Sequence, residues 1–410
     1  MPQITLLENK RIVLGVTGSI AAYKAVDLAS KLTQAGARVD VIMTEAAQRF
    51  VTPLTFQAVT GRAVYTDLWQ TAPGSDLPTH VAHVGLAEGA DLLVIAPATA
   101  DTIARIAHGF AGDLLAITAL AARCPLLIAP AMDGGMYANP ATQTNVAALQ
   151  ARGITILPPE TGRFASGLVG QGRLPETPTL LGAVRTLLGR TGVLRDRRVV
   201  VTAGGTREPL DPVRYITNRS SGKQGYALAQ AALDAGARVT LISAAHLETP
   251  YGADLIAVES AEQMKNAVLA SITEADALIM AAAVADFRPR RPSEHKIKKS
   301  DDLTLLLDKN PDILLAVKEQ RAKAHAPRVV VGFAAESQNL ADYARDKLER
   351  KGLDLLVAND ISAPDAGFEV DTNRVLILDA GGGQQELADS KAKIGEVIVT
   401  RIARLLGEQP

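Results

Sequence analysis

The sequence predicts an α/β protein with two doubly wound, mainly parallel sheets, one in each half of its 410 residues. Apolar runs of strand length alternate with stretches of helical character, and Gly or Pro bounds most of the runs. The pattern restarts in the middle of the chain, at RVVVTAGG (198–205). Runs that are apolar throughout indicate strands buried on both faces, as in parallel sheets covered by helices. This alternation is typical of flavodoxin- or Rossmann-like domains, in which ligands bind beyond the carboxyl ends of the strands.

In the first half, helical stretches separate the expected strands. The strands are predicted at 11–16, 38–44, 92–98, 125–132 and 154–157. One helix is expected from about Ile20 to Ala35 and another over 139–152, and a glycine follows each of them. Side chains directly after the strands are therefore candidates for a binding site.

The second half repeats this construction. Strands are predicted at 198–205, 238–245, 277–287, 328–336 and 354–360. A hairpin is expected over 374–387, and helices over 222–235 and from about Ser390. The halves share similar segments, such as 34–43 and 234–243, which common β-α-β construction explains better than a true duplication.

The restart places a domain boundary in GRTGVLRDRR (189–198), which is rich in Gly and Arg and has no apolar periodicity. We expect this segment to be a linker. The predicted domains are residues 1–190 and 191–410.

Composition excludes several classes of protein. The 43 basic and 44 acidic side chains give a net charge of −1, so no overall field attracts nucleic acid or an anionic membrane. Cys124 is the single cysteine, which excludes an intramolecular disulfide and favours a reducing, cytoplasmic location. The first residues lack the pattern of a secretory signal, and no apolar run is long enough for a transmembrane helix.

The first candidate site is GVTGSIAAYKA (15–25), a strand followed by a turn of small residues and the start of a helix. Free N–H groups at a helix N-terminus bind phosphate, and Gly18 and Ser19 allow close approach. The segment is not GxGxxG, so it favours a mononucleotide over a dinucleotide. Taken alone, ordinary turn formation explains it equally well.

Further segments of the first half carry a family resemblance. MTEAAQRF (43–50), APATAD (96–101) and APAM (129–132) follow predicted strands. With the turn at 15–25 they resemble the flavin-binding cysteine decarboxylases, in particular the decarboxylase half of the bifunctional phosphopantothenoylcysteine decarboxylase/phosphopantothenate–cysteine ligases. The resemblance implies FMN held by Gly18, Ser19, Ile20, Thr44, Pro97, Ala98 and Thr99.

The resemblance also assigns the chemistry. HVGLAEGAD (83–91) matches the stretch that carries the family's catalytic histidine, which points to His83. A histidine titrates near neutral pH and can move protons, while flavin transiently oxidises the thiol-bearing carbon so that carbon dioxide can leave. Without the resemblance, His83 reads as a surface histidine. His80 lies nearby, but no further ligand joins the pair, so a metal site is not expected.

Two positions depart from the family pattern. Asp133 stands where the family usually has the asparagine that binds the substrate carboxylate, and Ser166 stands where a catalytic cysteine is frequent. An ionised Asp133 would repel that carboxylate unless burial raises its pKa. The substrate residues implied are Asp133, Met136, Gly167 and Arg173, the last two in the Gly-rich flap GLVGQGR (167–173). The alternative for the flap is an unstructured loop.

The most informative segment of the second half is 201–229, in which Ser220, Ser221 and Gly222 lead into a helix and form a second candidate phosphate site. Its long T-x-E-P-x-D-P-V-R-x-I-x-N-x-S-S-G pattern is similar to the opening of the phosphopantothenate–cysteine ligases. The resemblance associates Asn218 with an acyl-cytidylate intermediate.

A basic loop, RPRRPSEHKIKKSDD (288–302), follows a predicted strand. A basic run is usually a solvated face, but this one leaves the sheet edge at which ligands bind. It therefore suits a lid over a triphosphate better than a nucleic-acid surface, because no aromatic residue is interleaved. The resemblance makes Lys296 the catalytic lysine of this lid.

The resemblance further implies CTP as co-substrate and cysteine and 4'-phosphopantothenate as substrates, with Mg²⁺ bound mainly through the CTP phosphates. It assigns CTP to Met280, Ala281, Ala282, Asp286, Lys296, Asn310, Pro311, Asp312, Ile313, Phe333, Lys347 and Lys351. Asn359 lies at a nearby strand end.

The resulting hypothesis is a bifunctional enzyme of coenzyme A synthesis, a ligase and a decarboxylase in one chain. The runner-up is a competent ligase fused to a flavin domain whose decarboxylation is weak or altered. A third reading makes the first half a regulatory flavin-binding module. The resemblance implies homo-oligomers, with trimeric flavin domains and dimeric ligase domains, together a dodecamer.

Overall fold

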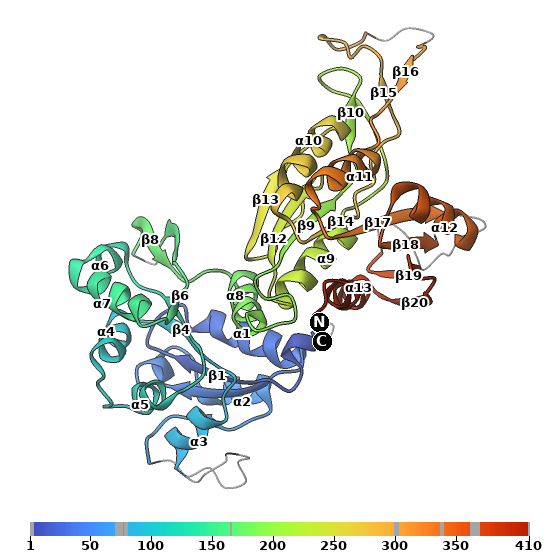
Figure 1. The fold of residues 1–410 in the computed structure, drawn as a ribbon. Coiled ribbons are helices and arrows are strands. Elements are labelled where there is room, and N and C mark those ends of the chain that lie inside the picture. Colours follow the sequence, from blue (N-terminus) through green and yellow to red (C-terminus); the bar gives the residue numbers. More distant parts are fainter. Residues whose placement is uncertain are drawn as a thin grey trace. The chain divides into compact units, whose positions relative to one another are not determined.

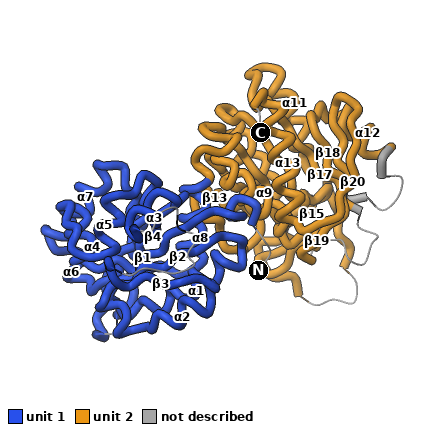
Figure 2. Tube along the Cα trace, turned by 90° about the horizontal axis from the view of Figure 1, so that it is seen from below, with its two compact units in different colours: residues 1–188 blue, residues 189–410 orange. Residues whose placement is uncertain are grey.

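The computed structural model describes residues 4–69, 77, 81–164, 166–298, 303–336, 340–360 and 370–408. The chain divides into two compact units, residues 1–188 and 189–410, and each is described by itself (Figure 2). Within the described ranges, no helix combines the length and the apolar character needed to cross a membrane.

The first unit is built on a six-stranded, all-parallel sheet in the order β3-β2-β1-β4-β5-β6 (Figure 1). Its strands are β1 (Arg11–Val16), β2 (Arg38–Met43), β3 (Val64–Tyr65), β4 (Leu92–Ala98), β5 (Leu126–Pro130) and β6 (Thr155–Ile156). The strand order changes direction between β1 and β4. In doubly wound sheets this switch point opens a crevice at the carboxyl ends of the strands, where ligands bind.

Helices cover both faces of this sheet. One face packs against α1 (Ala22–Gln34), α2 (Pro53–Thr60) and α8 (Thr177–Gly189). The other packs against α3 (Ala82–Glu88), α4 (Ala100–His108), α5 (Leu114–Ala121) and α7 (Pro140–Ala151). A short helix, α6 (Gly134–Ala138), follows β5. The doubly wound fold predicted for this half is confirmed.

The Gly-rich flap forms a hairpin instead of an unstructured loop. Strand β7 (Glu160–Arg163) pairs antiparallel with β8 (Val169–Arg173). The hairpin is held to the end of β5, because the N–H of Met132 donates a hydrogen bond to the carbonyl of Gly172 at 2.9 Å. A Cβ at Gly172 would lie 2.2 Å from the carbonyl oxygen of Met132, so the backbones can approach this closely only at a glycine.

The second unit contains an eight-stranded sheet in the order β13-β12-β9-β14-β17-β18-β19-β20. Its strands are β9 (Arg198–Ala203), β12 (Arg238–Ser243), β13 (Ala253–Ala257), β14 (Ala277–Met280), β17 (Val329–Glu336), β18 (Leu355–Asp360), β19 (Thr372–Asp379) and β20 (Gln384–Ser390). The sheet is parallel from β13 to β18, and β19 and β20 add antiparallel to its edge. The mainly parallel second sheet was predicted and is confirmed.

Helices again cover both faces of the sheet. Helices α9 (Lys223–Asp234) and α13 (Lys391–Leu405) pack on one face. Helices α10 (Ala261–Ser271), α11 (Ile313–Ala324) and α12 (Leu340–Lys351) pack on the other. The first residues of α13 are capped by Ser390, whose hydroxyl accepts the N–H of Lys393 at 3.2 Å, as the predicted helix start requires.

Two small antiparallel ribbons extend from the carboxyl ends of β9 and β14. They are β10 (Arg207–Pro209) with β11 (Tyr215–Thr217), and β15 (Phe287–Pro289) with β16 (Leu307–Lys309). They project beyond the sheet together (Figure 1). The strand predicted over 277–287 is therefore too long. It ends at Met280, because the N–H groups of the next residues turn to bond Gly204 and the hydroxyls of Thr202 and Thr206.

The predicted linker 189–198 is also more ordered than its composition suggested. Leu194 is completely buried in the core beneath α9 and α13. The Arg197 guanidinium forms ion pairs with Asp276 and Glu408. Because Leu194 and Arg197 both contact the rest of the second unit, this segment packs against that unit and is not an extended linker.

Candidate functional sites

Thr17 joins the ends of the two central strands of the first unit. Its hydroxyl donates to the carbonyl of Pro97 at 2.7 Å and accepts the N–H of Thr99 at 3.0 Å. Its own N–H also donates to the Pro97 carbonyl, at 3.3 Å. The predicted segments 18–20 and 97–99 are therefore brought to one edge of the sheet.

The end of β2 lies against the same turn. The N–H of Thr44 donates to the carbonyl of Val16 at 3.1 Å, and the Thr44 hydroxyl accepts the N–H of Ala47 at 3.2 Å. A Cβ on Gly18 would lie 2.5 Å from the Cβ of Ala46. A glycine is required at this position for the turn after β1 to fit against the segment after β2.

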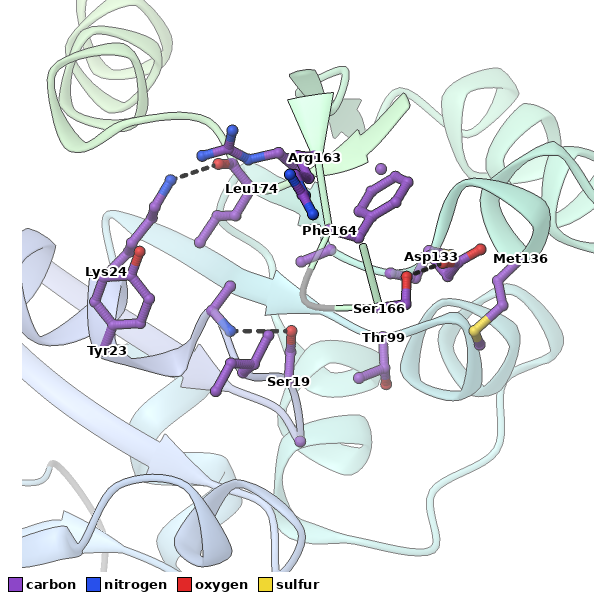
Figure 3. Close-up of a pocket in the computed structure, with 17 residues that line it drawn as sticks. Ser19, Tyr23, Lys24, Thr99, Asp133, Met136, Arg163, Phe164, Ser166 and Leu174 are labelled. Atoms are coloured by element: carbon purple, nitrogen blue, oxygen red, sulfur yellow. Dashed lines mark hydrogen bonds between the residues drawn. The ribbon is translucent and has the colours of Figure 1, made fainter. Parts of the chain in front are cut away.

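A cavity of about 470 Å³ opens at this edge (Figure 3). That volume lies in the range typical of small-molecule sites. Eight of the predicted residues line it: Gly18, Ser19, Ile20, Thr99, Asp133, Met136, Ser166 and Arg173. Thr44, Pro97, Ala98 and Gly167 are not part of the lining, although Pro97 is hydrogen-bonded to Thr17 and Thr44 to Val16, beside the turn that lines it.

The two positions that depart from the family pattern contact each other. The Ser166 hydroxyl donates to Oδ2 of Asp133 at 3.2 Å (Figure 3). Oδ1 of Asp133 accepts the N–H of Gly135 at 3.0 Å and caps α6. The hairpin thus brings Ser166 to Asp133, and the carboxylate has donors on both of its oxygens. Ala165, the residue before Ser166, lies outside the described residues.

Two cationic side chains of this cavity were not predicted. Lys24 is buried, and its ammonium donates to the carbonyl of Leu174 at 3.0 Å (Figure 3). It also donates to Glu176 at 2.6 Å. Arg163, on β7, also lines the cavity. Lys24 lies four residues after Ile20, and in the helix predicted from about Ile20 this spacing could have placed both on one face. With the rings of Tyr23 and Phe164 in the lining, the cavity offers apolar walls, hydroxyls and positive charge, which suit a flat ring with an anionic tail.

His83 does not line this cavity. It is half-buried in the first turn of α3, which packs on the face of the sheet covered by α5. His80 lies outside the described residues. The structure therefore brings together most of the predicted flavin and substrate residues but not the predicted catalytic histidine.

In the second unit, Asn218 reaches the loop that follows β14. Its amide donates to the carbonyl of Ala283 at 2.9 Å, and Ala283 forms a bridge with Gly205 at the end of β9. The N–H of Ala282 donates to the Thr202 hydroxyl at 3.1 Å. Asn218 and the predicted segment 281–282 therefore lie at one strand edge.

Asn310 extends this cluster. Its backbone N–H donates to the carbonyl of Asp286 at 2.8 Å, and its side-chain amide donates to the carbonyl of Ala285 at 2.8 Å. Its Oδ1 is buried and has no hydrogen-bond partner in the described part of the chain. Since buried polar atoms in native proteins are almost always bonded, this oxygen is free to accept a ligand donor.

Helix α12 adds two lysines on one face. The Lys347 ammonium donates to the carbonyl of Phe333 at 3.4 Å, and Lys351 forms an ion pair with Asp312, which caps α11. Burial lowers the pKa of Lys351 below its ordinary value, and the nearby charge of Asp286 opposes that shift. The buried Lys351 ammonium, at the carboxyl edge of the sheet, is suited to bind an anionic ligand.

Two of the predicted nucleotide residues belong to the core. Met280 and Ile313 are 5% and 4% exposed, and Met280 accepts the Thr202 hydroxyl at its sulfur. Their side chains are therefore poorly placed to contact a ligand. Pro311 lies between Asn310 and Asp312 at the start of α11.

Asn359 was noted in the sequence as a residue at a strand end but was not assigned a role. The residue lies near the end of β18 and is 9% exposed, and its Oδ1 has no hydrogen-bond partner among the described residues. The sequence signal for a role of Asn359 is its position directly after a run of apolar residues that forms a buried strand. An unpaired buried amide oxygen at the carboxyl edge is a second candidate for ligand contact.

Lys296 stands apart from the other predicted residues. Its side chain is exposed on the loop after β15, and it forms no hydrogen bond or ion pair within the described ranges. Residues 299–302 of the basic loop lie outside those ranges. The lid predicted over a triphosphate is thus described only up to Lys298.

Two protein-family models match the chain. Residues 2–189 match the flavoprotein model, and residues 194–406 match the model of the DNA/pantothenate metabolism flavoprotein C-terminal domain. The curated coenzyme A biosynthesis bifunctional protein CoaBC of Vibrio vulnificus (strain CMCP6) is 46% identical over 405 residues, which cover 98% of this chain and 99% of the relative. The chain belongs to the CoaBC family. It is therefore a bifunctional enzyme with a flavoprotein half, as the sequence predicted.

Other relatives of the CoaBC family are similarly close. The CoaBC of Bacillus subtilis (strain 168) is 46% identical over 406 residues, covering 98% of each chain. Among solved structures, the C-terminal domain of a CoaBC protein matches with a TM-score of 0.44 and 34% identity, covering 53% of this chain and 98% of that domain.

Proposed function

We propose that the chain performs two consecutive steps of coenzyme A synthesis, ligation in the second unit and decarboxylation in the first. The observation that carries this proposal is the near full-length similarity to CoaBC proteins, with both family models in one chain. The first step joins 4'-phosphopantothenate to cysteine, and the second removes the cysteine carboxylate as carbon dioxide to give 4'-phosphopantetheine.

In the ligation, a carboxylate must become a better acyl donor. Its oxygen attacks the α-phosphorus of CTP, pyrophosphate leaves, and the cysteine amine then displaces CMP to form the amide. Lys296, Lys347 and Lys351 would offset the negative charge that develops on the phosphates, and Mg²⁺ would bind mainly through those phosphates. Asn218 and Asn359 would hold the acyl group at the strand edge.

The nucleotide would bind between the loop after β14 and the start of α11. The unpaired oxygen of Asn310 supports this placement, because it needs a donor that the described chain does not supply. The remaining contacts would come from Met280, Ala281, Ala282, Asp286, Pro311, Asp312, Ile313 and Phe333. Comparing kcat/KM for CTP, UTP and ATP tests the preference for cytosine.

In the decarboxylation, the first unit would hold FMN with Gly18, Ser19, Ile20, Thr44, Pro97, Ala98 and Thr99. When bound, the flavin supplies reversible two-electron chemistry. Arg173 would attract the anionic substrate, while Asp133, Met136, Ser166 and Gly167 would orient it. His83 would accept and return a proton.

The hydrogen bond between Ser166 and Asp133 favours a second candidate function for this unit. A carboxylate in the cavity opposes the approach of a substrate carboxylate, and a serine hydroxyl is a poor acid. The alternative is an active ligase fused to a flavin domain whose decarboxylation is weak, altered or regulatory.

The setting of these reactions is also part of the proposal. A single cysteine favours a reducing, cytoplasmic location. We expect homo-oligomers, with trimeric first units and dimeric second units, which together give a dodecamer. Light scattering coupled to size-exclusion chromatography would show the mass of a dodecamer, and a monomer mass would contradict the assembly.

One experiment tests both halves. The purified protein is denatured, and the released chromophore is identified by mass spectrometry, with FMN expected. The native protein is then given 4'-phosphopantothenate, cysteine, CTP and Mg²⁺. Formation of 4'-phosphopantetheine supports both steps, whereas accumulation of the cysteine adduct would leave only the ligase. A colourless protein that FMN cannot reconstitute would contradict the flavin assignment.

A further inference from the structure

Asp211 is a buried carboxylate in the turn between β10 and β11 that the proposed reaction has not used. Its side chain is completely buried. Oδ1 accepts the N–H groups of Val213 and Arg214 at 2.8 and 2.9 Å. Oδ2 accepts Nε and Nη2 of the Arg214 guanidinium at 3.0 and 2.6 Å. One carboxylate therefore shapes the turn and holds a guanidinium beside it.

The same ion pair binds a segment far along the chain. The N–H of Ile297 donates to Oδ2 of Asp211 at 3.0 Å, and Nη2 of Arg214 donates to the carbonyl of Ile297 at 2.8 Å. Both backbone polar groups of Ile297 are thus bonded to one acid–base pair. A third bond runs parallel, from the N–H of Ser293 to the carbonyl of Leu210 at 2.9 Å. The turn 210–214 grips the segment 293–297 at both ends.

Ile297 directly follows Lys296, whose side chain is exposed and unbonded within the described residues. Adjacent Cα atoms are about 3.8 Å apart, so the grip on Ile297 also fixes the backbone of Lys296. Hydrogen bonds from Arg214, supported by the N–H groups of Ile297 and Val213, hold the pKa of Asp211 well below its ordinary value. The anchor therefore stays charged throughout the neutral range.

We propose that Asp211, together with Arg214, is a positioning residue that anchors the segment 293–297 and so presents Lys296 to the reacting phosphates. The proposal rests on the proposed role of Lys296 in ligation. An exposed lysine held in this way can act reproducibly, because only its four-carbon side chain remains to be ordered when the nucleotide binds. Misplacement of a catalytic group by about 1 Å can cost roughly 10²-fold in rate.

The test is Asp211→Asn, which keeps the size and shape of the side chain. The amide oxygen can still accept the N–H groups of Val213 and Arg214, so the turn is preserved. The amide nitrogen, however, would present its own hydrogens to the N–H of Ile297 and to the guanidinium. Donor then faces donor, and the anchor to the segment 293–297 is lost. Arg214→Lys is the second variant, since a lysine cannot bridge Asp211 and Ile297 with a planar fork.

Two readouts separate anchoring from general stability. Pyrophosphate release should show kcat lowered by about 10²-fold with KM for CTP changed by less than about threefold. Trypsin cleavage after Lys296 or Lys298, mapped by mass spectrometry, should be faster by about tenfold or more, because local opening becomes easier. The melting temperature and cleavage elsewhere in the unit should stay close to those of the parent protein.

Asp308→Asn is the matched control. It removes an exposed ion pair with Arg290, 2.9 Å long, on the ribbon formed by β15 and β16, and it leaves the bonds of Ile297 intact. Both readouts should equal those of the parent protein.

The outcomes are distinct. Parent-like values of both readouts in Asp211→Asn would overturn the proposal. So would faster cleavage with normal kcat, since the anchor would then not serve catalysis, or lowered kcat with unchanged cleavage. If Asp211→Asn does not fold, Arg214→Lys decides by the same two readouts. Lys296→Gln is assayed in parallel: normal pyrophosphate release in that variant would refute the role of Lys296 itself, whatever Asp211 does.

Discussion

The candidate sites of the two units are assembled in different ways. In the first unit, the turn after β1, the end of β4 and the hairpin β7–β8 enclose one cavity, and Thr17 and Met132 tie its walls together. In the second unit, Asn310 and Lys351 lie in one cluster of contacts, whereas Lys296 lies on a separate loop held by Asp211. A cavity walled by three segments suits a cofactor that stays bound, and a site that includes a separate loop suits a nucleotide that is exchanged in every turnover.

Lys296→Gln gives the largest expected effect and tests the loop of the second unit. Ligation should fall by about 10³-fold, because one cation that stabilises developing phosphate charge is lost. Decarboxylation of added cysteine adduct should be unchanged. Pyrophosphate release and carbon dioxide release are measured separately, with Lys323→Gln, a surface lysine on α11, as the control. Ligation within a few-fold of the parent rate would remove Lys296 from the mechanism.

His83→Asn tests whether His83 takes part in decarboxylation although it does not line the cavity of the first unit. Carbon dioxide release from the adduct should fall by about 10²- to 10³-fold, as expected for loss of a general acid–base group. Ligation should be unaffected. The control is His108→Asn, at the exposed end of α4. If carbon dioxide release stays normal, another group moves the proton.

Gly18→Ala probes the wall of the cavity in the first unit. The new methyl group would lie 2.5 Å from the Cβ of Ala46, so the turn after β1 must shift. Overpacking of this kind costs about 1–3 kcal/mol, and flavin affinity should fall by roughly tenfold or more. Flavin fluorescence titration of the apoprotein measures this. Gly112→Ala, where the nearest atom lies 3.4 Å away, should bind flavin like the parent protein.

Asn359→Ala probes the carboxyl edge of the sheet in the second unit. Its Oδ1 has no hydrogen-bond partner among the described residues, so losing this oxygen should change the melting temperature little. The KM for one ligase substrate should rise by about tenfold, the typical effect of one lost hydrogen bond. Asn373→Ala should instead lower the melting temperature and leave the KM unchanged, because Oδ1 of Asn373 accepts the N–H of Arg374 at 3.1 Å. A lowered melting temperature with unchanged KM in Asn359→Ala would make Asn359 a structural residue.

Asp133→Asn has the smallest expected effect. Removing a negative charge next to Ser166 should raise carbon dioxide release by about two- to tenfold, since repulsion of the substrate carboxylate is relieved. Asp101→Asn, on the exposed first turn of α4, is the control. Unchanged or slower decarboxylation would show that Asp133 is no handicap to this enzyme.

Much of the fold could be predicted, because its central strands are apolar on both faces and leave a clear periodicity. Strands β1 and β4 begin and end where the sequence places them. The edge strands β3 and β13 were missed, since one has two residues and the other is largely exposed. The end of β14 was placed too late because the small apolar residues after Met280 look like strand. Their N–H groups instead bond side-chain and backbone oxygens near β9.

The candidate sites were predictable where a residue follows a strand or belongs to a long motif. Ser19, Thr99 and Asn218 reach the expected edges for this reason. Contacts between residues far apart in the chain leave no such pattern in the sequence. The pairing of Ser166 with Asp133 depends on how a hairpin folds back, and the grip of Asp211 on Ile297 joins residues 86 apart in sequence.

The most direct test of two linked steps is the ratio of carbon dioxide to CMP. The parent protein is given 4'-phosphopantothenate, CTP and cysteine labelled in its carboxylate, and both products are followed through many turnovers. If both sites act in sequence, one carbon dioxide is released for each CMP once the adduct reaches a steady level. Steady formation of CMP with little labelled carbon dioxide would contradict the account and leave the first unit as a flavin domain without the second step.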